Sequence, residues 1–177
     1  MKLFTLGYQS LSPKIYVRAL VNAGVGMVVD VREHAWSQRP AFVKSSLENL
    51  LINVGIDYLH VKSAGNPSAN RKSARSAKEC LSRYREHLLK NSVCVDGLIR
   101  VVIEASAAGR PACLTCYERN HAECHRSVLV EELLKREPFT PIHLEPSISI
   151  ARNKGTKKRS TSITTSAFLA PALLPFK

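Results

Sequence analysis

Acidic residues are scarce in this sequence. Among its 177 residues, 14 are Asp or Glu and 26 are Lys or Arg, so the formal net charge is +12. This imbalance disfavours cationic partners and favours polyanions such as nucleic acid or nucleotides. Hydrophobic residues still make up 45% of the chain and charged residues only 23%, which excludes wholesale disorder and a collagen-like fibre. Length and composition therefore predict one folded domain, with room for a tail.

The sequence also lacks long apolar segments. Its first ten residues, MKLFTLGYQS, have one early Lys and then polar residues that interrupt the continuous apolar stretch a secretory leader would have. The apolar residues 167–176 include two prolines and are too few to span a bilayer. These observations predict a cytoplasmic protein with no membrane partner.

Cysteines are few and odd in number. There are five, and three of them fall within twelve positions, Cys113, Cys116 and Cys124. This distribution is not typical of a disulfide framework. It favours site chemistry in a reducing compartment, in agreement with a cytoplasmic location.

The positive charge is concentrated in two segments. Residues 147–177 contain six basic residues and no acid, together with many Ser and Thr, and are predicted to be a flexible tail that follows a domain of residues 1–146. Residues 62–90 contain eight basic residues and two acids, which accounts for the other half of the net charge. We expect a polyanion to contact these segments; the simpler alternative is a solvated basic face.

Hydrophobic patterning predicts alternating strands and helices. Short apolar runs indicate five strands, at residues 2–6, 26–31, 56–61, 112–117 and 140–144. Helical periodicity, N-cap residues and terminating glycines indicate helices at residues 13–22, 46–54, 73–89, 93–108 and 123–136, with a basic loop at 62–72. This order predicts an α/β fold, a three-layer Rossmann-like sandwich of about five mostly parallel strands with helices on both faces.

Polar residues follow several of the predicted strands. In parallel sheets, ligands bind beyond the carboxyl ends of the strands, so these residues are expected to converge. The candidates for binding an anion or substrate at this edge are Gly7, Tyr8, Ser10, Asp30 and Arg32, joined by Arg39 from the loop after the second strand. A structural alternative for Asp30 is to cap a loop or to pair with one of the two arginines.

The most informative stretch runs from residue 113 to 127. Cys116 and Glu118 are two apart and are expected to point to one face of a strand, with Cys113 on the other face. Cys124, His125 and Arg126 fall at the start of the next helix, where free backbone N–H groups attract anions. There a guanidinium fork would bind phosphate, an imidazole would move a proton, and the positive surroundings would lower the pKa of a thiol.

Two interpretations of this stretch use its cysteines. The spacing of Cys113, Cys116, His121 and Cys124 resembles a zinc knuckle, except that two residues separate the last pair where a knuckle has four. No cofactor is required by the sequence, and zinc stays an alternative. The second interpretation is a thiolate nucleophile, Cys124 or Cys116, although the spacing to the following arginine matches neither phosphatases nor sulfurtransferases.

Two other interpretations use the charged residues. In an acid–base site, Glu118 and His125 would transfer protons while Arg126, Arg32 and Arg39 bind a phosphate group. In a purely structural interpretation, Glu118 and Arg126 form a buried ion pair that ties strand to helix.

The chain resembles domain-of-unknown-function family 488. The resemblance rests on TLGYQSLS at 5–12, VVDVRE at 28–33, the Gly-Ile-Asp-Tyr step at 55–58, and above all Cys-x-Glu at 116–118 followed by Cys-His-Arg-Ser at 124–127. It implies an α/β fold, and it implies that the family's characteristic positions are Gly7, Asp30, Arg32, Arg39, Cys116, Glu118, Cys124, His125 and Arg126. The family brings little information about function. VVDVRE is also similar to a rhodanese strand, but the glycine-containing catalytic loop of that domain is missing.

Together these observations predict a site at the carboxyl edge of the sheet that binds or processes a phosphate-bearing ligand, a nucleotide or nucleic acid. The first alternative is a non-catalytic nucleic-acid-binding module in which the Cys-His-Arg turn is structural. The second is a zinc site or thiol chemistry. Whether the protein is an enzyme stays open at this level.

Overall fold

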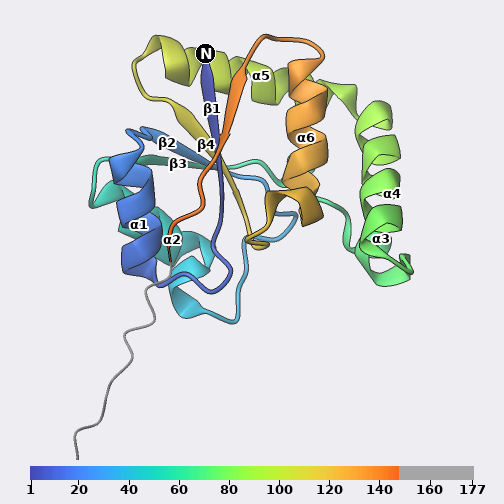
Figure 1. Ribbon diagram of the computed structural model, residues 1–177, viewed down its shortest axis with the longest axis horizontal. Helices are drawn as coiled ribbons and strands as arrows, with labels where there is room; N and C mark the ends of the chain where they lie inside the picture. Colours follow the sequence, from blue (N-terminus) through green and yellow to red (C-terminus); the bar gives the residue numbers. More distant parts are fainter. Residues whose placement is uncertain (148–177) are drawn as a thin grey trace, which may run out of the picture.

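The computed structural model describes residues 1–147, so nearly all of the predicted tail lies outside the described residues. Five strands form one parallel sheet in the order β3-β2-β4-β1-β5, which confirms the predicted α/β sandwich (Figure 1). The strands are β1 (Lys2–Gly7), β2 (Met27–Asp30), β3 (Asp57–His60), β4 (Ala112–Cys116) and β5 (Thr140–His143).

Helices cover both faces of the sheet. One face carries α1 (Pro13–Asn22) and α2 (Lys44–Ile52), and the other carries α5 (Ser92–Ala107) and α6 (His125–Leu134). A further helix, α4 (Ala77–Lys90), packs on the outside of α6, preceded by the short α3 (Ser68–Ser73) (Figure 1). Short 3-10 helices at Pro40–Phe42, Lys62–Ala64 and His121–Glu123 complete the described part.

Several predicted helix boundaries differ from the structure by up to four residues; the helix predicted at 46–54, for example, is Lys44–Ile52. Two of the differences are helix starts that lie later in the chain than predicted. The helix predicted from residue 73 begins at Ala77, because Ala74 is extended and the Ser76 hydroxyl accepts a hydrogen bond from the Glu79 N–H as the N-cap. The preceding loop at 62–72 also contains short helical turns. The helix predicted from residue 123 begins at His125, with Cys124 as its N-cap.

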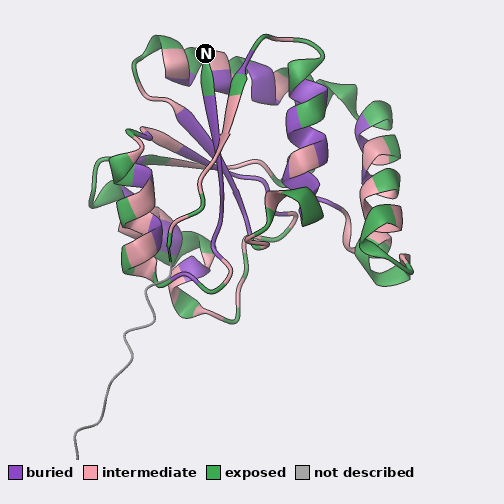
Figure 2. Ribbon diagram, viewed as in Figure 1, coloured by how far each residue is buried: buried purple, intermediate pink, exposed green. Residues whose placement is uncertain are grey.

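The core has two halves, one on each side of the sheet (Figure 2). Residues of β4 alternate between them: Cys113 packs with α1 and α2, whereas Leu114 and Cys116 pack with α4, α5 and α6. The predicted opposite directions of Cys113 and Cys116 are thereby confirmed. Every residue of β4 is buried, as expected for a central strand covered on both faces.

The strand order places a switch point at the end of β4. The chain runs from β1 through α1 to β2 and on to β3, then returns across the other face and inserts β4 between β1 and β2. Gly7 at the end of β1 lies beside Cys116, and Asp30 at the end of β2 lies beside Thr115. The carboxyl ends of three neighbouring strands therefore meet, which is where ligands bind in such sheets.

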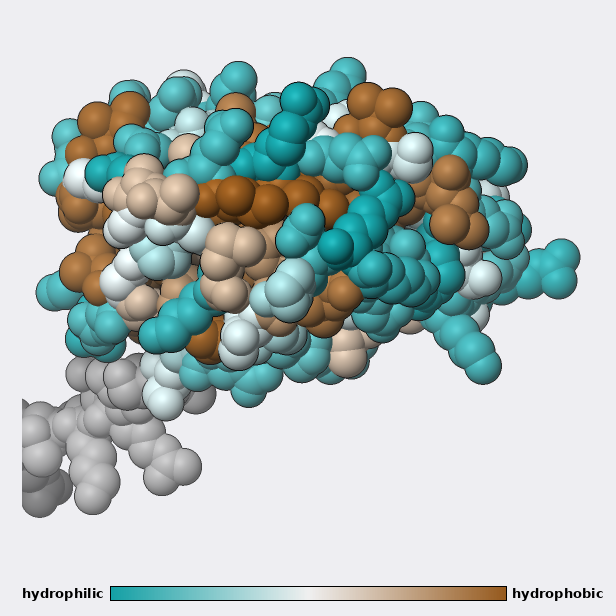
Figure 3. All heavy atoms as spheres, turned by 90° about the horizontal axis from the view of Figure 1, so that it is seen from above, coloured by the Kyte–Doolittle hydropathy of each residue, from teal (hydrophilic) through white to brown (hydrophobic). Residues whose placement is uncertain are grey.

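The opposite end of the molecule is seen in Figure 3, from the side on which β1 begins. Hydrophilic side chains cover most of this face, with a band of hydrophobic ones across it. Among residues 1–147, no helix is both long and apolar enough to cross a membrane.

Candidate functional site

Four side chains, of types that can bind a metal ion or act as nucleophiles, meet at the end of β4. They are Cys116 on the strand, Glu118 in the loop that follows, Cys124 at the N-cap of α6 and His125 in its first turn. One ligand atom from each lies within 4.8 Å of all the others. The structure brings these four residues together, and we call them the Cys-Glu-Cys-His cluster.

Both thiols contact the same two groups. The Cys116 and Cys124 Sγ atoms lie 3.2 and 3.0 Å from Glu118 Oε2 and donate hydrogen bonds to it in their protonated forms. The same sulfur atoms lie 3.7 and 3.8 Å from His125 Nδ1. Cys124 is fully buried and Cys116 is 5% exposed, whereas Glu118 is only partly buried. The carboxylate is thus the member of the cluster most open to solvent.

The imidazole of His125 has one orientation available. Its Nε2 atom lies 2.8 Å from the Val31 carbonyl oxygen, which can only accept, so Nε2 carries the hydrogen. The Nδ1 atom then faces the two sulfur atoms. The edge of the ring packs against Tyr84, with 5.0 Å between the ring centroids. His125 is thus held in place by its position at the start of α6, by the Val31 carbonyl and by the Tyr84 ring.

Arg126 lies directly beneath the cluster and is 1% exposed. Its Nε donates to Cys124 Sγ over 3.2 Å, and its Nη2 donates to the backbone carbonyl of Glu118 over 2.6 Å. Within residues 1–147 its Nη1 has no hydrogen-bond partner and its guanidinium forms no ion pair. The interpretation of Glu118 and Arg126 as an ion pair is therefore wrong, since the contact uses the backbone carbonyl. The sulfur of Cys124 is the available partner for this buried charge.

Gly7 allows this close packing. A Cβ atom at this position would lie 1.7 Å from the Glu118 carbonyl oxygen and 2.9 Å from Arg126 Nη2. Any side chain here would displace the loop that carries the carboxylate. Gly7 therefore contributes to the site by leaving space for this packing.

The contacts inside the cluster shift the pKa of each member. Burial opposes ionisation of Cys124, but its hydrogen bonds to Cys116 and His125 and the nearby positive charges outweigh burial and hold its pKa well below the usual value. The hydrogen bond to Cys124, and then burial, raise the pKa of Cys116 well above its usual value. Burial, followed by the Cys124 charge, raises the pKa of Glu118. For His125, burial is outweighed by contact with Cys124, so its pKa is raised. Of the two thiols, Cys124 is therefore the one that ionises more readily.

Asp30 and Arg32 form a buried ion pair at the end of β2. Arg32 Nε and Nη2 donate to Asp30 over 2.8 and 2.5 Å, and its Nη1 donates to the Tyr8 hydroxyl and the Phe42 carbonyl, both over 2.9 Å. The Tyr58 hydroxyl donates to the same carboxylate over 2.7 Å. The pKa of Tyr58 is raised by burial and by the Asp30 charge. These contacts engage every terminal nitrogen of Arg32, so its main visible role is structural.

Arg39 is held over the first loop of the chain. Its guanidinium lies 4.6 Å from the Phe42 ring centroid and donates to the backbone carbonyls of Tyr8, over 2.8 Å, and Leu11. Its positive charge has no acidic partner among the residues described. Ser10 is exposed, has a positive φ of 62° and does not line the site cavity described next.

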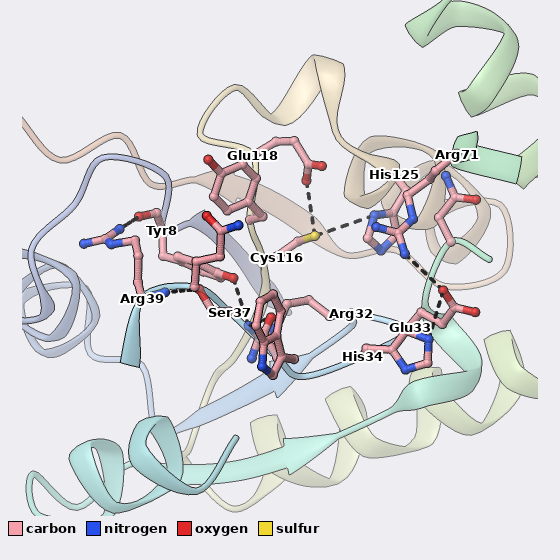
Figure 4. A pocket seen from close by; sticks show the side chains of 14 residues that line it. Tyr8, Arg32, Glu33, His34, Ser37, Arg39, Arg71, Cys116, Glu118 and His125 are labelled. Carbon is pink, nitrogen blue, oxygen red and sulfur yellow. Dashed lines mark hydrogen bonds and ion pairs between the residues drawn. The ribbon is translucent and has the colours of Figure 1, made fainter. Parts of the chain in front are cut away.

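A cavity of about 410 Å³ opens above the cluster (Figure 4). Its floor contains Cys116, Glu118 and His125, and its walls contain Tyr8, Arg32 and Arg39. The sequence did not identify several further lining residues, which come from α3 and from the loops after β2, β3 and β4: Glu33, His34, Trp36, Ser37, Gln38, Asn66, Arg71 and Tyr117. A signal for one of them existed, since Trp36 is the single tryptophan of the chain and stands in a predicted loop.

The zinc-knuckle spacing selects two residues that lie elsewhere. Cys113 is buried on the other face of the sheet, and burial raises its pKa to about 12. His121 stacks on His143, with 3.6 Å between ring centroids. The structure replaces this pair with Glu118 and His125, so a possible metal-binding cluster exists with a different ligand set.

Comparison with known proteins identifies the family of this chain but no characterised relative. Neither curated proteins nor solved structures give a match. The family model described as "Domain of unknown function DUF488" matches residues 12–133, more than half of the chain and including the whole Cys-Glu-Cys-His cluster. The chain therefore belongs to the DUF488 family.

Proposed function

We propose that the Cys-Glu-Cys-His cluster binds a zinc-type divalent cation, and that this cation acts on a phosphate-bearing ligand, a nucleotide, in the adjoining cavity. The observation that carries the proposal is the juxtaposition of four ligand atoms, within 4.8 Å of one another, and a cavity that three of the four residues line.

The spacing of the ligand atoms suits tetrahedral coordination. Zinc bonds of about 2.3 Å to sulfur and about 2.0–2.2 Å to nitrogen or oxygen place neighbouring ligand atoms roughly 3.3–3.8 Å apart. The four sulfur–oxygen and sulfur–nitrogen separations in the cluster range from 3.0 to 3.8 Å. Four of the six pairs of ligand atoms therefore lie near tetrahedral spacing and the other two lie within 4.8 Å, so shifts of at most about 1 Å would admit a cation.

Contacts around the cluster also suit a metal. The Val31 carbonyl holds His125 with its Nδ1 atom toward the sulfur atoms, which is the outer contact that metal-binding histidines usually have. The charges would also balance: the three negative charges of two thiolates and the Glu118 carboxylate equal the positive charges of one divalent cation and the buried guanidinium of Arg126. The buried arginine, which has no carboxylate partner among residues 1–147, is thereby explained.

The position of Glu118 favours a reactive cation over a purely structural one. Structural zinc sites are closed by four buried ligands, whereas catalytic sites use three protein ligands and an exchangeable fourth position. Cys116, Cys124 and His125 are at most 7% exposed, while Glu118 is the most open member and faces the cavity (Figure 4). If a ligand displaces this carboxylate, the cation would polarise the ligand as a Lewis acid.

The cavity walls favour a nucleotide. Arg39 and Arg71 supply guanidinium groups that suit phosphate. Trp36 and Tyr117, which are 65% and 45% exposed, supply aromatic surfaces on which a base can stack. A volume of about 410 Å³ lies within the range of small-molecule sites.

The other chemistries predicted for these residues fit less well. A thiolate nucleophile must reach its substrate, but Cys124 is 0% exposed. An imidazole that moves protons to a ligand needs a free ring nitrogen, but those of His125 face Val31 and the two sulfurs. All five cysteines, which lie in the described part, are free thiols, so we also expect a reducing compartment such as the cytoplasm.

Metal analysis of the protein purified without chelators tests the proposal. We expect about one zinc per chain in the parent protein, and less than about 0.1 in Cys124→Ser and His125→Gln. The matched control is Cys94→Ser, which removes a thiol outside the cluster and should keep the metal. A parent protein that contains no metal and fails to bind added zinc in competition with a chromogenic chelator would refute the proposed function.

A further inference from the structure

The cavity above the cluster continues into two further hollows. A second hollow of about 330 Å³ shares four lining residues with the first: Asn66, Arg71, Glu118 and His125. A third, of about 720 Å³, shares three with the second: Ala77, Leu81 and Glu123. The three hollows thus form one depression that starts at Trp36, passes the cluster and continues between α4 and α6. We call its second and third parts the α4–α6 groove.

Basic side chains line one wall of this depression. Arg71 lines the first and second hollows, Arg75 the second, and Lys78 and Arg85 the third. Neither Arg75 nor Lys78 forms an ion pair with any residue from 1 to 147. They belong to the basic segment 62–90, which therefore borders the candidate site directly.

The acidic residues along the depression are mostly engaged. Arg71 binds Glu33 over 3.0 Å at the rim, and Arg85 binds Glu131 over 2.7 Å on the opposite wall. Two acids of the groove have no cationic partner in the described part: Glu118, and Glu123, which accepts a hydrogen bond from Asn120 over 2.9 Å. The groove is lined by four cations, Arg71, Arg75, Lys78 and Arg85, and by three acids, Glu118, Glu123 and Glu131, so it is net basic beside the cluster.

We infer that the α4–α6 groove binds a single-stranded nucleic acid, so that one nucleotide enters the cavity while the phosphates next to it lie along Arg71, Arg75 and Lys78. This inference rests on the proposed function, because it extends the nucleotide site to a polynucleotide. Exposed aromatic surface at the cavity and cations along a groove are the combination that binds single strands. A base paired inside a duplex could not reach the cavity floor without leaving its stack.

The chain contains a built-in reporter for this binding. Trp36 is the single tryptophan, lines the cavity and is 65% exposed. A base stacked in the cavity quenches its fluorescence, whereas a polyanion that only contacts basic surfaces leaves it unchanged. Heparin therefore serves as the control polyanion.

The experiment titrates the full chain with a 12-nucleotide single strand, the matching duplex and heparin, at several salt concentrations. We expect the single strand to quench Trp36 and to bind at least about tenfold more tightly than the duplex. A triple variant, Arg71→Gln/Arg75→Gln/Lys78→Gln, should lose at least about tenfold in affinity, and its log–log salt slope should fall by about 2, or roughly 0.7 per lost phosphate contact.

The matched control removes the same charge elsewhere. Lys14 and Arg18 on α1 and Arg100 on α5 are exposed and do not line the depression. Their triple glutamine variant should bind as the parent does. Equal losses in both triple variants, equal affinity for duplex and single strand, or quenching by heparin would each overturn the inference.

Metal content, measured on the same samples, separates this inference from the proposed function. The groove variant should keep its metal, whereas Cys124→Ser should lose it. If the protein contains metal but does not bind single strands selectively, the inference about the α4–α6 groove is wrong and the proposed metal site stands. If the parent protein contains no metal but binds single strands selectively, the proposed metal site is wrong and the inference about the groove stands.

Discussion

Gly7 offers a sharp test of the site, because a single methyl group reaches its centre. In Gly7→Ala the new Cβ would lie 1.7 Å from the Glu118 carbonyl oxygen, and real Cβ atoms essentially never approach closer than 3.0 Å. The loop that carries Glu118 must therefore move by more than about 1 Å. It is also held there by the hydrogen bond from Arg126 to the same carbonyl, over 2.6 Å. The substitution should both strain the fold and displace one ligand of the proposed cation.

The expected magnitude follows from the cost of overpacking a buried position. Such insertions typically cost about 1–3 kcal/mol, and the short distance to backbone puts this one at the upper end. For a domain of this size, that corresponds to a fall in Tm of roughly 3–10 °C. The loss of correct Glu118 geometry should also weaken zinc binding by about 10–100-fold. Thermal unfolding with and without chelator, and chelator competition, measure the two effects.

The matched control is Gly97→Ala in the middle of α5. No atom lies within 4 Å of the position that its Cβ would occupy, and its backbone is helical. This substitution should stabilise the protein by about 0.5–1 kcal/mol, because alanine has the higher helix propensity. If Gly7→Ala retains the parent's Tm and zinc affinity, the close packing of β1 against the Glu118 loop is not as described.

Three further substitutions test other parts of the site. Tyr58→Phe removes the hydroxyl that donates to Asp30 over 2.7 Å and should lower the free energy of unfolding by about 1.5–3 kcal/mol in urea titrations; a change below about 0.5 kcal/mol would contradict this. Arg126→Met removes the N–H donor to Cys124 Sγ and should weaken zinc binding by about 10–100-fold in chelator competition, and unchanged affinity would count against the role given to this arginine. Burial, followed by the nearby positive charges of His121 and Arg126, lowers the pKa of His143, so protonation favours the unfolded state. Stability should therefore decline as the pH falls below about 6.5. The urea concentration at the unfolding midpoint, measured between pH 5 and 8, should show this decline, and His143→Gln should make it smaller.

Much of the fold could be predicted because its signals are local. Continuous apolar runs at β2 and β4 indicate strands buried on both faces, and Ser12 followed by Pro13 indicates the start of α1. The strand order could not be predicted in the same way. It depends on β4 being inserted between β1 and β2, which is a choice among long-range pairings that no local pattern encodes.

The site was predictable in its residues but not in its contacts. Spacing along the chain predicted that Cys116 and Glu118 point the same way and that Cys124 stands at a helix start. The two side chains do meet and Cys124 is the N-cap of α6, although Glu118 lies in the loop after β4. The spacing could not show that Arg126 would bind a sulfur and a carbonyl instead of the Glu118 carboxylate, because that depends on how the loop folds back over Gly7. The basic residues after β3 join the site through α3, a helix that stands where a loop was predicted.

The topology explains why one strand supplies most of the chemistry. In the sheet, β4 lies between β1 and β2. The chain that follows β4 toward α6 therefore passes close to the carboxyl ends of both neighbours. Nine residues are enough to lead from Cys116 through Glu118 to His125, which binds back onto Val31 at the end of β2. The cluster is therefore held by both neighbouring strands, through Gly7 on one side and Val31 on the other. A cation bound there would join three strand ends and α6, so its removal should lower the stability of the whole sheet edge and not only the affinity for a ligand.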